Sequence, residues 1–289
     1  MKHLNLFIEL TRLNKPIGYM LLFWPCLWGL TLVYNFDGEI HTYIKFLIFF
    51  LLGSILMRSA GCIVNDITDK KFDQKVERTK NRPIASEKIS TKLALLYALI
   101  LCFLAFLVLI NFNLLTIIMA LASMPFAFSY PLMKRFTYWP QLFLGITFNY
   151  GLVLAWISIN NSLSLTPIVF YIGAIFWTLG YDTIYGYQDI KEDEIIGVKS
   201  TSIKFKNSPK NFLILCYSTL IIALISIGLI MKFNYIYFLT LIIPLYHLFF
   251  YQIKFLDIKY PENCQKIFKS NNILGLIIFV NVLIGNLFS

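Results

Sequence analysis

Nine predominantly apolar stretches follow one another along the chain, and each is close to the roughly 20 residues that a helix needs to cross a bilayer. Spanning segments must satisfy their backbone hydrogen bonds internally, so we expect an all-α, multi-pass membrane protein. Charged residues make up 14% of the sequence, below the roughly one quarter of a soluble domain. The expected spans are residues 16–35, 43–64, 92–110, 114–130, 140–159, 165–186, 211–231, 235–253 and 271–288.

The separation of the third and fourth spans depends on residues 111–113 alone, and a merged pair would leave eight spans. Apart from this ambiguity, no low-complexity linker or soluble segment interrupts the pattern. We therefore expect residues 1–289 to form one transmembrane domain. The five cysteines are scattered singly, which favours reduced packing residues over a disulfide framework or a metal site.

Basic residues supply an independent test of the nine-span interpretation. Of the 25 Lys and Arg, 22 fall in the N-terminal tail and in the connections that lie on the same side of the membrane as that tail. Lys45 and Lys232 alone fall on the opposite side, and Arg58 lies within a span. The positive-inside rule then predicts a cytoplasmic N-terminus. The same rule explains the net charge of +10 without nucleic acid as a partner.

Acidic residues concentrate in two clusters, NDITDKKFD at residues 65–73 and YDTIYGYQDIKED at residues 181–193. Ten of the 15 Asp and Glu lie in or beside them, at the predicted cytoplasmic ends of the second and sixth spans. If each helix continues into its cluster, the acids of the cluster share one helical face. The expected stripes are Asn65, Asp66, Asp69 and Asp73 on the second helix, and Asp182, Tyr185, Asp189 and Asp193 on the sixth.

Carboxylate and amide oxygens, without His or Cys, select hard cations such as Mg²⁺ or Ca²⁺. Basic residues flank both clusters, and a metal with Arg and Lys nearby is suited to a diphosphate. A solvated interfacial charge run is the alternative for either cluster alone, but two clusters in phase on one side favour a site. The flanking basic residues are Lys70, Lys71, Arg78, Arg82, Lys191 and Lys199.

These motifs resemble the UbiA-type membrane prenyltransferases, whose signatures are NDxxDxxxD on the second helix and DxxxD on the sixth. Further segments resemble the 4-hydroxybenzoate polyprenyltransferase branch, and with the motifs they cover most of residues 10–205. The segments are RLNKPIGYMLLFWPCLWGL from residue 12, MRSAGCIVNDITDKKFDQKVERTKNRPIAS from residue 57, YPLMKRFTYWPQ from residue 130 and DTIYGYQDIKEDEIIGVKST from residue 182. The second motif departs from close relatives in its interior, because those relatives are more acidic where this chain has Ile190 to Glu192.

The resemblance implies a ring of nine helices around a central cavity that is open sideways to lipid. It also implies two Mg²⁺ ions that bridge a polyprenyl diphosphate, in a pocket lined by Asp182 and Tyr185. One ion would be held by Asn65, Asp66, Asp69 and Asp73, and the other by Asp189 and Asp193.

Three further basic residues are candidates for the site. Arg58 lies on the face of Asn65 and Asp69, and we assign it to the pocket rather than to snorkelling, because charged residues inside spans are usually functional. Lys134 and Arg135 either anchor the topology or recognise an anion. In the resembling family this region is associated with the carboxylate of the aromatic acid, and the planar fork of Arg135 makes it the better candidate.

The expected activity is Mg²⁺-dependent transfer of a polyprenyl chain to 4-hydroxybenzoate, ortho to its hydroxyl, in ubiquinone biosynthesis. A UbiA-type enzyme with another acceptor (naphthoate, haem or glycerol phosphate) is the first alternative, and a cation-coupled transporter is the second. Transporters place their key acids near the midplane, whereas these lie at one interface. We expect a bacterial inner-membrane protein with its site on the cytoplasmic side and no obligate protein partner.

Overall fold

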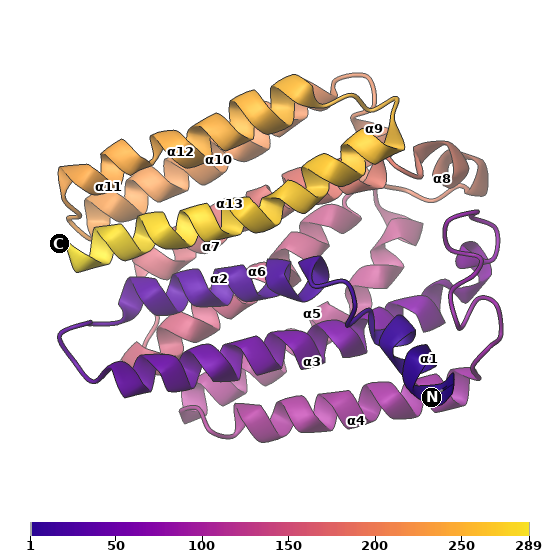
Figure 1. Cartoon of the computed structure of the whole chain (residues 1–289), viewed down its shortest axis with the longest axis horizontal. Helices are drawn as coiled ribbons and strands as arrows, with labels where there is room; N and C mark the ends of the chain where they lie inside the picture. The colour runs from indigo at the N-terminus through magenta and orange to yellow at the C-terminus, as the bar shows by residue number, and fades with distance from the viewer. Residues whose placement is uncertain (1, 289) are drawn as a thin grey trace.

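The computed structural model describes residues 2–288, and all secondary structure in this range is helical, as the sequence predicts. Spanning helices lie side by side along one direction, while α1, α8 and α9 gather at one end of the bundle (Figure 1). The elements are α1 (Lys2–Thr11), α2 (Ile17–Val33), α3 (Ile40–Asp73), α4 (Thr91–Leu109), α5 (Leu114–Phe136), α6 (Pro140–Asn160), α7 (Leu165–Gly186), α8 (Ile190–Ile196), α9 (Thr201–Lys204), α10 (Pro209–Ile230), α11 (Tyr235–Thr240), α12 (Ile242–Leu245), the π-helix η1 (Tyr246–Ile253) and α13 (Pro261–Leu287).

Within residues 2–288, eight helical segments are long and apolar enough to cross a membrane, so the chain is a multi-pass membrane protein. One of the eight is the composite of α11, α12 and η1, which together cover Tyr235–Ile253. Apolar α2 has only 17 residues, so the predicted count of nine spans stays a prediction. The third and fourth spans are separate helices, because Asn113 caps α5 by accepting a hydrogen bond from the Thr116 backbone.

The centre of the bundle is held by tryptophans that have hydrogen-bond partners. Trp28 and Trp177 pack with ring centroids 4.9 Å apart. Trp28 Nε1 donates to the Gly275 carbonyl at 2.9 Å, and Trp177 Nε1 donates to Asn271 Oδ1 at 2.8 Å. Because lipid gives helices little hydrophobic reason to associate, close packing and interhelical hydrogen bonds carry the assembly. These contacts fix α2 and α7 against α13.

The acidic clusters have different backbones. Helix α3 continues through the first cluster to Asp73, as predicted. The prediction of one continuous stripe from Asp182 to Asp193 is wrong, because α7 ends at Gly186 and Asp189 is the N-cap of the separate helix α8.

The break falls at Gly186, a residue type that weakens helices, and there residues of α9 contact the last turn of α7. Ser202 donates its hydroxyl to the Thr183 carbonyl at 2.8 Å, and this carbonyl is the acceptor that the N–H of Tyr187 would need in a continuing α-helix. The Tyr187 N–H bonds to Ile184 O instead, and the helix stops.

Candidate active site

Three carboxylates of α3 form the centre of the polar site. Asp66, Asp69 and Asp73 are only 2%, 2% and 7% exposed, and they follow one another on one face of the helix. A buried carboxylate is costly unless it is paired or hydrogen-bonded. These three acids therefore require cations from other parts of the fold.

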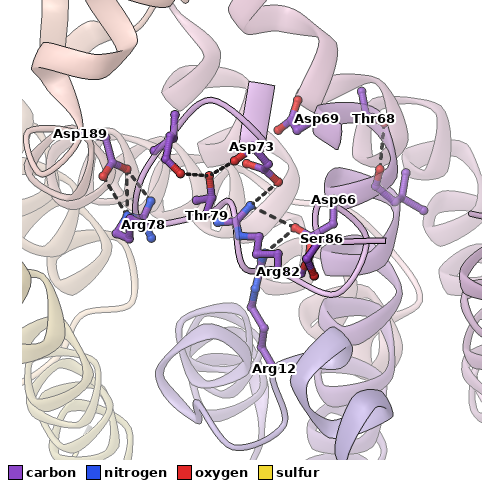
Figure 2. A network of polar contacts seen from close by, with 12 residues as sticks. Arg12, Asp66, Thr68, Asp69, Asp73, Arg78, Thr79, Arg82, Ser86 and Asp189 are labelled. Carbon is purple, nitrogen blue, oxygen red and sulfur yellow. Dashed lines mark hydrogen bonds and ion pairs between the residues drawn. The ribbon is translucent and has the colours of Figure 1, made fainter. Parts of the chain in front are cut away.

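Basic side chains from three separate segments meet these acids, and Figure 2 shows two of them, Arg12 and Arg82. Arg12, just after α1, pairs with Asp66 at 2.5 Å. Arg82 contacts Asp66 at 3.2 Å and Asp73 at 2.8 Å, so it bridges two acids. From the last turn of α5, Lys134 Nζ lies 2.5 Å from Asp69 Oδ2.

The loop after α3 positions Arg82 through local hydrogen bonds. Gln74 Nε2 donates to the Ala85 carbonyl at 3.0 Å, and Thr79 Oγ1 donates to the Asp73 carbonyl at 3.0 Å. Ser86 Oγ donates to the carbonyl of Arg82 itself at 2.8 Å. The loop consequently folds back over the end of α3 rather than extending away from it.

The same loop joins the two acidic clusters. Arg78 forms an ion pair with Asp189, with its Nε 2.8 Å from Asp189 Oδ1. Its Nη1 donates to the Tyr185 hydroxyl at 2.9 Å. Burial lowers the pKa of Arg78, but the hydrogen bond and charge of Asp189 outweigh burial, so this pKa is raised overall. The structure thus brings the two clusters together through a guanidinium from the first cluster's loop.

Four of the basic residues predicted to bind substrate lie outside these ion pairs. Lys70 pairs with Glu87 at 2.8 Å, and Lys191 is exposed on α8. Arg135 donates to the Thr68 carbonyl at 2.8 Å, and Lys199 Nζ donates to the Phe136 carbonyl at 3.3 Å. Their contact with a substrate stays a prediction.

Sequence reasoning missed Arg12 as a site residue. It was counted only among the basic residues that set the topology, since it lies 54 residues before its partner Asp66. In the structure its backbone has a φ of 55°, a left-handed conformation that non-glycine residues rarely adopt. This turn ends α1 and directs the guanidinium to the acids. The available signal was its position in the RLNKP segment, directly before the first span.

An apolar cavity of about 390 Å³ lies within the bundle, lined by residues of α2 to α6 and of the turn between α4 and α5. Arg58 is the only Lys or Arg among its lining residues. The guanidinium lies 5.4 Å from the centroid of the Phe148 ring, and its Nε is buried without a hydrogen-bond partner. Asp182 on α7 interacts electrostatically with this guanidinium. Arg58 therefore lines a cavity and retains an unused donor there, and its part in the site stays a prediction.

The donor chemistry of the acidic clusters fits a hard divalent cation. All predicted ligands are oxygen donors, and Asp69 Oδ1 is buried without a hydrogen-bond partner. Within residues 2–288, however, no three His, Cys, Asp or Glu side chains are grouped closely enough to hold a metal as they stand. The carboxylates are contacted by Arg12, Arg82 and Lys134. A metal ion and these cations compete for the same oxygens.

A bundle of spanning helices with buried acids and cations at one end, above an apolar cavity, defines a membrane protein with a site for an amphipathic anion. The model of the UbiA prenyltransferase family matches residues 22–279, and the chain belongs to this family.

Curated relatives share this family assignment across nearly the whole chain. The 4-hydroxybenzoate polyprenyltransferase of Bos taurus mitochondria is 41% identical over 97% of this chain and 75% of its own. The 4-hydroxybenzoate octaprenyltransferase of Psychromonas ingrahamii is 39% identical over 97% of this chain and 96% of its own. The 4-hydroxybenzoate geranyltransferase 2 of Lithospermum erythrorhizon is 39% identical over 99% of this chain and 92% of its own.

Solved structures agree on the fold. A UbiA homologue from Aeropyrum pernix K1 has a TM-score of 0.75 at 18% identity and covers 93% of this chain and 98% of its own. A UbiA homologue from Archaeoglobus fulgidus, bound to GPP and Mg²⁺, has a TM-score of 0.70 at 16% identity and covers 96% of this chain and 99% of its own.

The first prediction concerns Asp193, which precedes the end of α8. Burial and the nearby charge of Asp189 raise its pKa from 3.8 to about 6. Since the folded state holds this proton more tightly than the unfolded state, Asp193 contributes most stability below about pH 4, and the contribution is lost as pH rises to about 6. In metal-free protein, the Tm of wild type minus the Tm of Asp193→Asn should decrease as pH rises across this window. A difference that is constant from pH 4 to 6 would contradict the raised pKa.

Proposed function

We propose that this chain is a Mg²⁺-dependent 4-hydroxybenzoate polyprenyltransferase. It transfers a polyprenyl chain from polyprenyl diphosphate to the ring carbon ortho to the hydroxyl of 4-hydroxybenzoate, a reaction of ubiquinone biosynthesis. The supporting observation is the juxtaposition of buried acids and cations with an apolar cavity that contains the unpartnered Arg58. A donor with a charged head and a hydrocarbon tail matches both halves of this site.

Two sets of oxygen ligands would hold the metal ions. The first set is Asn65, Asp66, Asp69 and Asp73 at the end of α3, and the second is Asp189 and Asp193 on either side of the start of α8. Bound Mg²⁺ supplies electrostatic stabilisation of the diphosphate as its charge increases on leaving. Because burial raises the pKa of Asp193 to about 6, a proton competes with a metal ion for this ligand around that pH.

The cations around the acids have a second role toward the diphosphate. Arg12, Arg82 and Arg78 each present a guanidinium at the acidic end of the bundle, and Lys134 presents an ammonium. Guanidinium forks bind phosphate oxygens in bidentate fashion, and an ammonium binds them as a point charge. We assign these four residues to holding the diphosphate and stabilising it as the leaving group.

Arg58 is our candidate for the carboxylate of 4-hydroxybenzoate. The family resemblance points to Lys134 and Arg135, but neither lines the apolar cavity. Arg58 lines the apolar cavity and has a free donor. A carboxylate bound there would hold the phenol ring close to the reacting end of the donor, where the ring carbon bonds to the allylic carbon as its C–O bond to diphosphate breaks, and the released diphosphate then takes the ring proton.

The alternatives have less support. The curated relatives named above are all 4-hydroxybenzoate prenyltransferases, which favours this acceptor over naphthoate, haem or glycerol phosphate. A cation-coupled transporter would need its acids near the midplane, whereas Asp66, Asp69 and Asp73 occupy the last turns of α3. We propose no obligate protein partner.

Asp66 tests the catalytic assignment. Asp66→Asn keeps the shape of the side chain but removes its charge, and we expect kcat for prenyl transfer to fall about 100-fold or more. The assay combines membranes, 4-hydroxybenzoate, Mg²⁺ and radiolabelled geranylgeranyl diphosphate. Asp37→Asn, an exposed residue between α2 and α3, is the matched control and should retain full activity. Wild-type transfer by Asp66→Asn, or product from another acceptor alone, would contradict the proposal.

Arg58 tests the acceptor assignment. Arg58→Gln should raise KM for 4-hydroxybenzoate roughly tenfold or more, because the variant loses a charge-assisted hydrogen bond to the carboxylate. The matched substrate is 4-methylphenol, which lacks the carboxylate, and its slower reaction should be equal in variant and wild type. If both acceptors lose activity in equal proportion, Arg58 does not bind the carboxylate.

We place the protein in the bacterial inner membrane with its acidic end in the cytoplasm, as the distribution of Lys and Arg predicts. The exposed residues Lys75, after α3, and Ser162, after α6, lie at opposite ends of the bundle and report on this orientation. In intact spheroplasts an impermeant maleimide should label Ser162→Cys, whereas Lys75→Cys should be labelled only after lysis. The reverse pattern would place the site outside.

A further inference from the structure

The cavity begins beside the polar site and continues along α3 into the bundle. Arg58, Gly61 and Tyr130 line it at the end nearer to the acids, and Phe50 and Phe112 line it at the other end. Gly61 lies only four and five residues before Asn65 and Asp66 on the same helix. A hydrocarbon tail attached to a diphosphate at the acids therefore has direct access to the cavity.

Two glycines of α3 line the cavity, and both face open space. A Cβ atom added at Gly53 or at Gly61 would meet no heavy atom within 4 Å. Other helical glycines, such as Gly29 and Gly145, lie against the backbone of a neighbouring helix, which explains their lack of a side chain by packing. Close helix packing therefore does not explain Gly53 and Gly61. Their effect is to leave free volume in the cavity.

The two glycines lie at different depths. They are eight residues apart, which corresponds to about 12 Å along α3 at ~1.5 Å per residue. Gly61 is close to the acids, where the first isoprene unit of a donor would lie. Gly53 is close to the far end, where only a longer tail reaches.

Aromatic rings lie at the end of the cavity just beyond Gly53. The ring centroid of Phe112, in the turn between α4 and α5, lies 5.0 Å from that of Phe50 and 5.2 Å from that of Phe46. Gly53 therefore lies close to this aromatic end of the cavity along α3. A bulky side chain at this position would shorten the space without touching the polar site.

We propose that Gly53 determines donor tail length, because its missing side chain leaves the space in which the later isoprene units of the polyprenyl diphosphate lie. This inference rests on the proposed function, since the diphosphate must be held at the acids for its tail to point along α3. It assigns Gly53 to specificity between donors and gives it no part in the chemistry.

The test is a series of Gly53→Ala, Gly53→Leu and Gly53→Phe, compared with Gly61→Leu. Purified full-length protein is assayed with Mg²⁺, 4-hydroxybenzoate and either dimethylallyl or geranylgeranyl diphosphate. We expect kcat/KM for the long donor to fall roughly tenfold or more relative to the short donor in Gly53→Leu and Gly53→Phe. Gly61→Leu should reduce kcat/KM for both donors to the same extent. Gly53→Ala should change the ratio least.

Leu52→Phe is the matched control, because this neighbouring side chain is 43% exposed on the outer surface of α3 and does not line the cavity. It should leave the donor ratio unchanged. If the Leu and Phe variants do not fold, the Ala variant is the test. Its ratio of kcat/KM values should then shift toward the short donor. A wild-type ratio throughout the folded members of the series would overturn the inference.

A second measurement separates this inference from the proposed function. The rise in Tm caused by each donor with Mg²⁺ reports binding without any acceptor. In wild type the long donor should give the larger rise, and Gly53→Leu should remove this advantage. If the rise in Tm differs between the donors but no product forms from 4-hydroxybenzoate, the acceptor is rejected and the assignment of Gly53 to tail length is supported. Equal rises for both donors in wild type would overturn the assignment of Gly53 and favour a cavity filled by membrane lipid.

Discussion

The pairing of the buried carboxylates at the end of α3 is the constraint on which the site depends. Asp66, Asp69 and Asp73 lie where the bundle excludes water, and each would be costly to bury without a cation. The cations come from the end of α1, the end of α5 and the loop after α3. Meeting this one electrostatic requirement therefore brings together segments that are distant in sequence. Such pairs contribute little net stability, which favours a functional reason for their presence.

The loop after α3 has a double role because it carries two arginines. Arg82 contacts the first cluster, and Arg78 reaches Asp189 in the second. The break between α7 and α8 makes this contact accessible, since Asp189 then lies in a turn rather than on a long straight helix. Loop and turn together convert two separate acidic patches into one polar site.

In the proposed function, the polar site and the cavity divide the binding of an amphipathic donor between them. Charged groups occupy the end of the bundle, whereas the cavity is lined mainly by apolar side chains, with Arg58 close to the boundary. Hydrocarbon in such a cavity needs no specific partner, only volume, so small residues such as Gly53 determine what fits. The two kinds of specificity, for the diphosphate and for tail length, therefore depend on different physical properties.

The sequence by itself determined the helical class, the positions of the spans and the clustering of acids on α3, because hydropathy and helical periodicity are local properties. Arg82 and Lys134 could be predicted as site residues from their flanking positions. Arg12 could not be assigned, since its contact with Asp66 depends on the turn after α1. The end of α7 at Gly186 was likewise seen only in the tertiary structure, where Ser202 of the distant helix α9 donates to the Thr183 carbonyl beside it. Both depend on contacts between segments that the helical period of one segment does not encode.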